Sequence, residues 1–472
     1  MTLLVDSPSL APSRTRLDRW PSLIAPLATL VVCLIGIDSA SFWRDEAATL
    51  DAVSRPIPAL LRTLTQVDAV HGAYYLLLWP IVHTFGSGEF AVRFPSALAM
   101  AAAAYGIGKL GARLHSRRAG VLAGLVFAVL PQVSRYGQEA RSYALVVAVA
   151  VLASHLLVGA LAQPSRRRWV GYGCAIGALG LLNLFALLLL VAHAVFVLCQ
   201  DRPSVREWLL AAGLGCLPSV PILVLAVRQQ DQLSWVGPPD ANSGGDLAAW
   251  LAGSVLSAVI ASVLIGLFLG RRPVRLPLAS LTLPWLVLPP IVLILGSALK
   301  PVYVQRYLLF CLPALALVVG AGLATVAVAP RVVGLVLLAV LGLPTQSAVR
   351  QVGGHGDDIG DAATILAQEA RPGDGVLFNC PSCHYPDMPR EFEFAYPQAF
   401  APLVDVTIAA SPSTSNTLRG TESAHARLAH VARVWVVDVD GGAEPVALHD
   451  SGFRLVSVQQ AGNIQIEDYE RS

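Results

Sequence analysis

Long apolar runs separated by short polar segments dominate the chain up to about Arg350. A helix needs roughly 20 mostly apolar residues to cross a bilayer, and the cytoplasmic ends of membrane helices carry an excess of Lys and Arg. Arginines gather at alternate ends of the apolar runs. The pattern therefore predicts an all-α polytopic membrane bundle of about eleven spans. The predicted spans are 21–40, 92–112, 119–133, 143–162, two short helices within 170–199 that turn near Asn183, 208–227, 247–270, 277–299, 308–328 and 332–347.

One apolar run, 74–85, is only about a dozen residues long, which is too short to span. We expect it to lie along the outer interface, inside a first outer loop of residues 41–91. The helix that follows then runs inward to a basic, cytoplasmic cluster: Lys109, Arg113, Arg117 and Arg118. The next helix returns outward and brings Glu139 to the same side as Asp45. If 74–85 crossed the membrane, Glu139 would be cytoplasmic.

The two ends of the chain differ in character. Residues 1–20 hold Arg14, Arg16 and Arg19 and are predicted to be a cytoplasmic tail, followed by the membrane module 21–347. Residues 348–472 have the composition of a soluble domain, and an odd number of spans places them outside. A helix is predicted over 357–370 and strands at 376–378, 434–437, 453–458 and 463–466. This predicts a small extracytoplasmic α/β domain.

Composition agrees with the membrane assignment. Of the 472 residues, 55% are hydrophobic and 14% charged, with a mean hydropathy of +0.62. Soluble domains are about 25% charged. The net charge of +2 gives no support to nucleic-acid binding. Cys380 and Cys383 have the spacing of a metal-binding pair, but no further ligands are evident, so no metal site is predicted. In an oxidising compartment the two cysteines are expected to form a local disulfide or to stay free.

Two acidic clusters flanked by arginine lie at predicted outer helix ends. The first is Ser41 to Ala48 (SFWRDEAA) and the second is Arg135 to Tyr143 (RYGQEARSY). Charged groups at membrane helix ends are costly to bury, and they commonly mark functional sites. We therefore expect the two clusters to converge.

The tract from Phe42 to Leu145, including Asp68 to Tyr75 (DAVHGAYY), resembles the polytopic GT-C glycosyltransferases. It is most similar to the protein-mannosyltransferase and lipid-A-aminoarabinose-transferase branch, as in actinobacterial mannosyltransferase sequences. The resemblance covers the first third of the chain, is looser through the middle helices and is poor after about Arg350. It implies a GT-C fold, a polyprenyl-phosphate-linked sugar as donor, and inverting transfer to a hydroxyl on the outer face.

The resemblance also assigns roles to residues. Asp45 and Glu46 match the first-loop acid at the reaction centre, and Glu139 matches the second acidic loop. Mannose is the expected sugar, and arabinose is the alternative. The residues expected to bind the donor phosphate are Arg135, Arg141, Lys300 and Arg306. The residues expected to contact substrate are His71, Tyr74, Gln138 and Tyr303. Where many relatives have His-Pro-Pro, this chain has His71, Gly72 and Ala73.

Sugar transfer to a hydroxyl needs a base near the nucleophile and stabilisation of the departing phosphate. Asp45 can accept the acceptor's proton, and arginine or lysine can offset the charge on the phosphate. Two carboxylates could instead hold a divalent cation there. Each role has a structural alternative: Glu139 as an ion pair with a neighbouring arginine, Arg306 and Lys300 as headgroup anchors, and His71 as an interfacial hydrogen-bonding residue.

Two other classes of function stay open. A secondary transporter usually shows repeated halves and charges near mid-membrane, whereas these acids lie at outer helix ends. A scaffold for envelope-glycan assembly would keep the acidic motif for packing alone. The acceptor, whether glycan, lipid or protein, does not follow from the sequence. Membrane lipids are the remaining expected partners.

Overall fold

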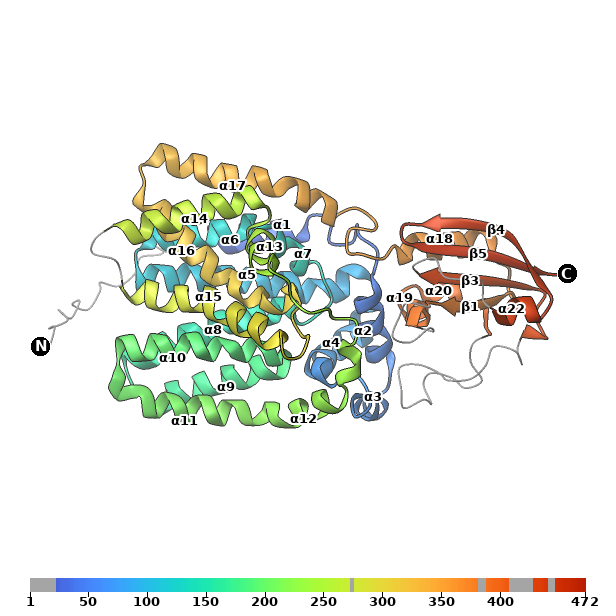
Figure 1. The fold of residues 1–472 in the computed structure, drawn as a ribbon, viewed down its shortest axis with the longest axis horizontal. Coiled ribbons are helices and arrows are strands. Elements are labelled where there is room, and N and C mark those ends of the chain that lie inside the picture. Colours follow the sequence, from blue (N-terminus) through green and yellow to red (C-terminus); the bar gives the residue numbers. More distant parts are fainter. Residues whose placement is uncertain (1–22, 272–275, 381–387, 407–427, 440–445) are drawn as a thin grey trace, which may run out of the picture.

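A bundle of long helices carries a smaller, sheet-containing unit at one end (Figure 1). The computed structural model describes residues 23–271, 276–380, 388–406, 428–439 and 446–472. Most helices of the bundle run roughly along the long axis of the molecule. They are α1 (Ile24–Leu34), α5 (Glu89–Leu114), α6 (Arg117–Val129), α8 (Tyr143–Ala162), α9 (Arg166–Leu182), α10 (Leu189–Gln200), α11 (Val205–Cys216), α12 (Val220–Arg228), α14 (Val255–Gly270), α15 (Leu276–Ser297), α16 (Leu312–Thr325) and α17 (Val328–Val349).

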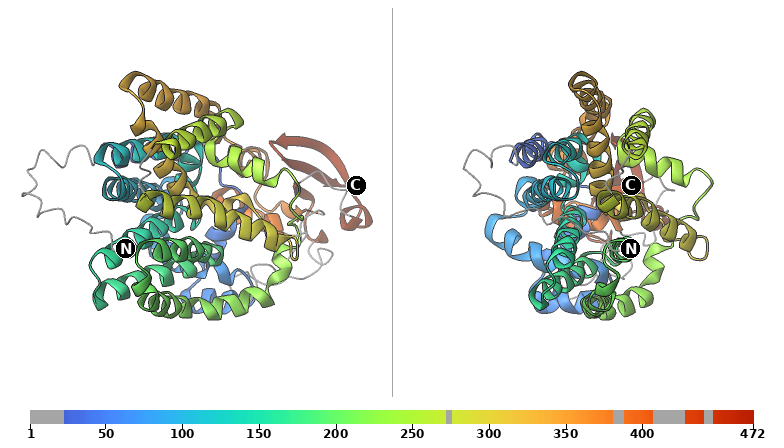
Figure 2. Two further views of the ribbon diagram at one scale, coloured as in Figure 1. Left: turned by 60° about the vertical axis from the view of Figure 1, so that its left-hand side comes forward. Right: turned by 90° about the vertical axis from the view of Figure 1, so that its left-hand side faces the viewer.

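Further helices of the bundle are α2 (Arg44–Ser54), α3 (Ile57–Leu64), α4 (Gly72–Phe85), α7 (Pro131–Gly137) and α13 (Ser243–Ala252). They lie between the long helices and the sheet, except α13, which lies beside α14. In the right-hand view of Figure 2 the long helices are seen nearly end-on, with the sheet behind them. The first outer loop predicted from the sequence is thus largely helical.

Six of the described helices are long and apolar enough to cross a membrane, or up to eight if each of two bent pairs is one span. The chain is therefore a multi-pass membrane protein. The bends account for part of the difference from the predicted eleven. Helices α6 and α7 meet at 64° where Pro131 starts a new helix, and α13 and α14 meet at 86° after Gly253, whose φ is +93°. Helix α1 is only 11 residues long in the described part. Helix α4 has 14 residues and is not among the candidate spans.

Polar side chains mark several helix boundaries. Asn183 accepts a hydrogen bond from Phe185 N at 2.9 Å, where α9 ends and the chain turns toward α10. Ser116 caps α6 by accepting from Ala119 N at 3.2 Å, and Ser254 caps α14 by accepting from Ser257 N at 3.1 Å. The predicted turn near Asn183 is confirmed.

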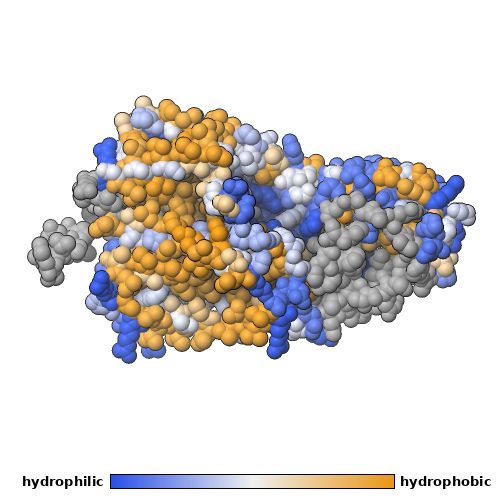
Figure 3. Space-filling model, in the orientation of Figure 1, coloured by the Kyte–Doolittle hydropathy of each residue, from blue (hydrophilic) through white to orange (hydrophobic). Residues whose placement is uncertain are grey.

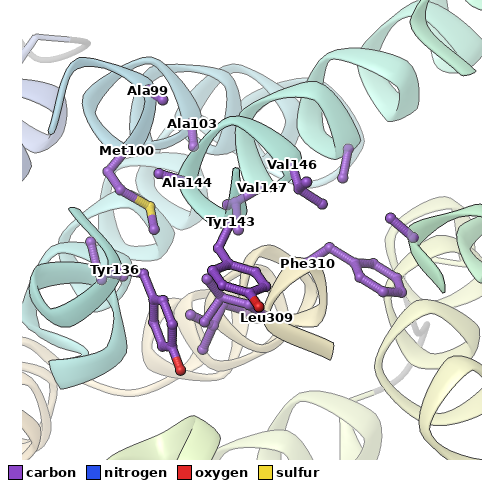
Figure 4. Close-up of a cluster of buried hydrophobic side chains, with 14 of the residues drawn as sticks. Ala99, Met100, Ala103, Tyr136, Tyr143, Ala144, Val146, Val147, Leu309 and Phe310 are labelled. Carbon is purple, nitrogen blue, oxygen red and sulfur yellow. The ribbon is translucent and has the colours of Figure 1, made fainter. Parts of the chain in front are cut away.

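Close packing of small residues holds the centre of the bundle together. A Cβ added at Gly120 of α6 would meet the carbonyl oxygen of Gly108 of α5, and one added at Gly320 of α16 would meet the backbone of Ala123. Small residues of this kind let membrane helices approach closely. Figure 4 shows the apolar core next to this region, where Met100 and Ala103 of α5 pack near Ala144 and Val147 of α8.

Apolar side chains cover the outside of the bundle, while hydrophilic residues gather at its two ends and on the sheet-containing unit (Figure 3). Of the residues of α17, only Leu338, Gly342 and Val349 are buried. Side chains such as Val332 and Val336 are exposed. Such an exposed apolar surface is expected of helices that face lipid.

The C-terminal unit contains a five-stranded sheet with strand order β2-β1-β3-β5-β4. Strand β1 is parallel to β2 and β3, whereas β5 is antiparallel to both β3 and β4. The strands are β1 (Gly375–Asn379), β2 (Val404–Asp405), β3 (Arg433–Val439), β4 (Phe453–Ala461) and β5 (Ile464–Arg471), and the helices are α18 (Ile359–Glu369), α19 (Phe392–Ala395), α20 (Pro397–Phe400) and α22 (Val446–Asp450).

The secondary structure expected from the sequence here is present: a helix within 357–370 and a strand at each of the predicted positions. Cys380 is disulfide-bonded. Cys383 lies outside the described residues, so its pairing with Cys380 stays a prediction.

Candidate active site

Asp45, Arg141 and Arg306 form an ionic cluster at the end of the bundle that faces the sheet. Asp45 lies in the first turn of α2, Arg141 lies between α7 and α8, and Arg306 lies in a 3-10 helix, Gln305–Cys311. Asp45 Oδ2 is 3.5 Å from Arg141 Nη2 and 3.6 Å from Arg306 Nη2. The structure thus brings together three of the predicted site residues from distant parts of the chain.

The Asp45 carboxylate is ionised but accepts no strong hydrogen bond at Oδ2. Burial would raise the pKa of Asp45, but the charges of Arg141 and Arg306 more than offset it and hold the pKa below its usual range. At distances of 3.5 and 3.6 Å the contacts are ion pairs, and Oδ2 has no hydrogen-bond partner among the described residues. The side chain is 16% exposed. A negatively charged oxygen is therefore available in a largely buried site.

Arg141 is held in place by two hydroxyls. Its Nη1 donates to Thr49 Oγ1 at 3.2 Å and to the Tyr75 hydroxyl at 3.2 Å. Tyr75 in turn donates to Asp68 Oδ2 at 2.9 Å. Asp68 has a φ of +57°, the left-handed conformation in which Asp is tolerated better than most residues. Thr49, Tyr75 and Asp68 were not among the predicted site residues, although all three lie in the tract that carries the resemblance.

Arg306 lies between two aromatic rings. Its guanidinium carbon is 5.6 Å from the ring centroid of Trp43 and 5.5 Å from that of Trp235. Cation–π contacts of this kind are stronger when the guanidinium group is desolvated. Arg306 Nε is buried and has no hydrogen-bond partner among the described residues. The group therefore has hydrogen-bonding capacity to offer an anion.

Glu46 occupies a different environment. Its carboxylate accepts from Arg93 Nε at 2.9 Å, from Arg93 Nη2 at 2.6 Å and from Ala140 N at 2.8 Å. The side chains of Glu46 and Arg93 are both 0% exposed. Arg93 also donates to the carbonyl oxygens of Ile37, Ala40 and Ser41. Glu46, predicted together with Asp45, thus holds the start of the outer loop to α5 and does not share the Asp45 cluster. The sequence signal for Arg93 was an arginine at the start of the predicted span 92–112.

Glu139 and Arg135 form a second ion pair beside the cluster. Arg135 Nη1 donates to Glu139 Oε2 at 2.7 Å, and Nη2 donates to the carbonyl oxygen of His355 at 3.1 Å. Burial, reinforced by the charges of Glu46 and Asp45, raises the pKa of Glu139 to about 7 against the opposing effect of Arg135. Oε1 of Glu139 has no hydrogen-bond partner among the described residues. Glu139 therefore neutralises Arg135 fully only above about pH 7.

Two further predicted residues border the cluster. His71 is partly buried, with its ring 6.0 Å from that of Tyr75, and burial together with the charge of Arg141 lowers its pKa to about 4. The imidazole is therefore neutral near pH 7. Tyr74 is buried on α4.

The remaining predicted residues make contacts elsewhere. Gln138 Nε2 donates to the carbonyl oxygens of Cys33 and Ile35 and so holds the end of α1. The Tyr303 hydroxyl donates to Ser243 O at 3.2 Å, which ties its loop to α13. Lys300 is exposed and donates to Gln230. The described contacts of these residues do not reach Asp45. Within the described ranges, no three His, Cys, Asp or Glu side chains group as metal ligands would.

Two tyrosines beside the cluster were not predicted. The rings of Tyr136 and Tyr143 meet edge-on with centroids 5.4 Å apart. In Figure 4 their hydroxyls point to the same side, away from the apolar residues Met100 and Ala144. Both lie in the motif Arg135 to Tyr143. The spacing of the motif alone does not show that the two rings meet beside the cluster.

Comparison with known proteins gives a consistent result. Residues 73–225 match the family described as dolichyl-phosphate-mannose-protein mannosyltransferase. ArnT from Cupriavidus metallidurans, in a crystal structure bound to undecaprenyl phosphate, is 14% identical with a TM-score of 0.63, and the alignment covers 95% of this chain and 98% of that chain. At this level of identity the likeness shows a common fold. No curated protein matches the chain significantly by sequence.

Two weaker structural similarities complete the comparison. The oligosaccharyltransferase of Archaeoglobus fulgidus is 12% identical with a TM-score of 0.48, covering 88% of this chain and 68% of that chain. The arabinofuranosyltransferase AftD from Mycobacteria is 18% identical with a TM-score of 0.48, covering 99% and 42%. The family match over residues 73–225 and the fold shared with ArnT together support a membrane glycosyltransferase with a GT-C fold.

Proposed function

We propose that the protein transfers a sugar, with mannose as the first candidate, from a polyprenyl-phosphate donor to a hydroxyl acceptor with inversion at the anomeric carbon. The observation that carries this proposal is the position of the Asp45 carboxylate between the guanidinium groups of Arg141 and Arg306. A base and two anion-binding groups within one site meet the two needs of this reaction.

The donor class is supported by two of the comparisons. The matched family is described by a dolichyl-phosphate-mannose donor, and the ArnT structure contains undecaprenyl phosphate. Both molecules are polyprenyl phosphates, so a donor of this class suits the cluster.

The reaction assigns a separate task to each charge. The acceptor oxygen attacks the anomeric carbon, its proton passes to Asp45 Oδ2, and the bond between that carbon and the phosphate oxygen breaks with its electron pair on the phosphate. The phosphate gains negative charge as it leaves. Arg306, and Arg141 beside it, stabilise that charge through charge-assisted hydrogen bonds.

The same arginines regulate the basicity of Asp45. Without donor, Arg141 and Arg306 hold the pKa of Asp45 below its usual range, which makes the carboxylate a weak base. A bound phosphate competes with Asp45 for the two guanidinium groups. Because part of their charge is then offset by the phosphate, the basicity of Asp45 rises when the donor is present. The carboxylate is thus at its most effective once the substrate is in place.

We place the site and the C-terminus outside the cytoplasm, with about eleven spans. Basic side chains at the opposite end of the bundle support this orientation. Arg113 donates to Val158 O, Arg168 to Gly159 O and Arg271 to Thr325 O, all at helix ends remote from α2. Such clusters are typical of cytoplasmic ends.

The test is a transfer assay with purified protein, radiolabelled polyprenyl-phosphate mannose, and membranes depleted of this protein as the source of acceptor. We expect label to pass from the lipid to a new product in the presence of wild-type protein and not with Asp45→Asn. Polyprenyl-phosphate arabinose, tested in parallel, identifies the sugar. Movement of donor across vesicle membranes without a new glycosidic bond would instead identify a transporter. Absence of product with either donor, despite intact donor binding, would favour a scaffold.

A further inference from the structure

The C-terminal unit contacts the first outer loop through consecutive residues just before Asp45. Ser41 Oγ donates to Asp358 Oδ1 at 3.0 Å, and Phe42 N donates to the Tyr396 hydroxyl at 3.1 Å. Ser41 N also donates to Val352 O at 2.8 Å. These contacts fix the backbone that leads into α2.

Asp357 completes this set of contacts at the start of the helix. Its Oδ2 accepts from Arg44 N at 2.9 Å and from Arg44 Nε at 2.9 Å, and its Oδ1 accepts from Arg44 Nη2 at 2.8 Å. The residue at the N-cap position of α2, Trp43, makes no side-chain cap. Asp357, which is distant in the chain, therefore accepts a hydrogen bond from a backbone N–H group in the first turn of α2. Its negative charge also interacts favourably with the helix dipole.

The sheet in turn holds Asp357. Asn463, in the turn between β4 and β5, donates from Nδ2 to Asp357 Oδ1 at 2.8 Å. The Asp357 side chain is only 3% exposed. The carboxylate is thus fixed on one side by the C-terminal unit and on the other by the first turn of α2, the turn that contains Asp45.

Resting on the proposed function, we propose that Asp357, with Asp358 and Tyr396, positions the catalytic loop. The C-terminal unit acts as a clamp that sets the first turn of α2 relative to Arg141 and Arg306. Asp357 does not touch the reacting atoms and acts through Arg44 and the backbone beside it. A shift of about 1 Å in a reacting group can lower a rate about a hundredfold, so a clamp on this turn affects catalysis more than binding.

The main test compares Asp357→Ala with wild type in the transfer assay. We expect kcat to fall about ten- to a hundredfold while KM for the donor changes by less than about twofold. Asp357→Asn should recover part of kcat, because its side-chain oxygen can still accept from Arg44 N, whereas its amide nitrogen cannot accept from Arg44 Nη2 and Asn463 Nδ2 as Oδ1 does. Tyr396→Phe removes the acceptor for Phe42 N and the donor to Glu89 Oε1, leaves the Asp357 contacts in place, and should have a smaller effect. Asp450→Ala, which removes an exposed carboxylate from the same unit, is the matched control and should behave as wild type.

Each outcome decides the proposal. A normal kcat for Asp357→Ala beside an inactive Asp45→Asn would overturn it. So would a raised donor KM at unchanged kcat, because Asp357 would then act in binding. A reduced kcat that Asp357→Asn does not recover would also count against the helix cap. Elution as a single species and retained donor binding exclude a folding failure.

Amide hydrogen exchange tests the clamp without any activity. In Asp357→Ala, the amides of residues 41–47 should exchange faster than in wild type, while those of α5 and α8 should not change. If wild-type protein makes no product from any polyprenyl-phosphate sugar, the proposed function fails. The hydrogen-exchange measurement still tests whether Asp357 orders residues 41–47. Unchanged exchange at these residues would overturn the clamp.

Discussion

The carboxylates of Asp45 and Glu46, consecutive residues in the first turn of α2, enter two separate ionic environments. Asp45 faces Arg141 and Arg306, while Glu46 is enclosed with Arg93. Neighbouring side chains on an α-helix point about 100° apart, since a turn holds about 3.6 residues. Two consecutive acidic residues can therefore supply one carboxylate to the candidate active site and one to a buried ion pair that holds the fold together.

Asp45→Asn should abolish transfer while leaving donor binding intact. Asparagine keeps the shape of aspartate but cannot accept the acceptor's proton, and general-base assistance accounts for about a hundred- to ten-thousandfold in rate. Because the change also removes a charge that competes for Arg141 and Arg306, the donor should bind as tightly as before or more tightly. Single-turnover transfer and equilibrium donor binding measure the two effects. Near-normal turnover in this variant, beside an inactive Glu139→Gln, would move the base to Glu139.

Arg306→Ala should weaken use of the donor. Removing a charge-assisted hydrogen bond to the phosphate in a largely buried site costs about 2 kcal/mol, or roughly a thirtyfold change in apparent donor affinity. Lys300→Ala is the matched control, since Lys300 is exposed and its described partner is Gln230. It should leave donor saturation close to wild type, although the sequence predicts a phosphate contact for it. Equal effects of the two variants would show that Lys300 reaches the donor.

Arg93→Ala should destabilise the protein strongly. Breaking a fully buried ion pair leaves Glu46 as an unpaired charge, which costs about 3–5 kcal/mol. The carbonyl oxygens that now accept from Arg93 would be left without this donor as well. Thermal unfolding in detergent measures the destabilisation, and Arg62→Ala, at an exposed arginine of the same outer loop, is the control. A melting temperature close to that of wild type would mean that the pair adds little to stability.

The contribution of Glu139 to stability should fall as pH rises from about 4.5 to about 7. Its folded-state pKa of about 7 exceeds the ordinary value of 4.5, so in this window the native protein holds a proton that the unfolded chain has released. His71 and His355 have pKa values lowered by burial to about 4 and contribute the opposite slope. The difference in melting temperature between wild type and Glu139→Gln, followed across pH 5 to 8, isolates the Glu139 contribution. The same difference at every pH would show that Glu139 does not titrate there.

A cysteine placed at Gly237 should react with an impermeant thiol reagent in intact cells. Gly237 lies in the exposed segment between α12 and α13, and nothing lies within 4 Å of a Cβ added there. Gly137 is unsuitable, because a side chain there would meet Cys33. Ala162→Cys, at the exposed end of α8, should react only after lysis. The reverse pattern would invert the orientation of the protein, as would cytoplasmic activity of a reporter fused after Ser472.

Much of the secondary structure could be predicted from the sequence, because apolar runs, prolines and capping residues act locally. The turn at Asn183 and the bounds of α8 are examples. The bend at Pro131 also had a local signal, which the prediction of one helix over 119–133 did not use. The length of an apolar run does not distinguish one straight helix from two shorter helices that meet at a bend.

The site could be predicted only in part. The family resemblance indicated that Asp45, Arg141 and Arg306 belong to one site. It could not show that Gln138 points toward α1, or that Arg93 neutralises Glu46, because these depend on how helices distant in the sequence rotate against each other. No rule of residue spacing predicts the aromatic rings that contact Arg306, because Trp43 and Trp235 are far from it in the sequence.

The clamp between Arg44 and Asp357 also bears on how the protein is made. Its two residues are 313 positions apart in the chain. At a synthesis rate of about 5–20 residues per second, the ribosome needs about 15 to 60 s to pass from one to the other. During that interval the outer loop has none of its contacts with Asp357, Asp358 or Tyr396, although the helices around it can already be inserted. A nascent chain should therefore acquire a well-ordered first turn of α2 only after the C-terminal unit has been synthesised and folded.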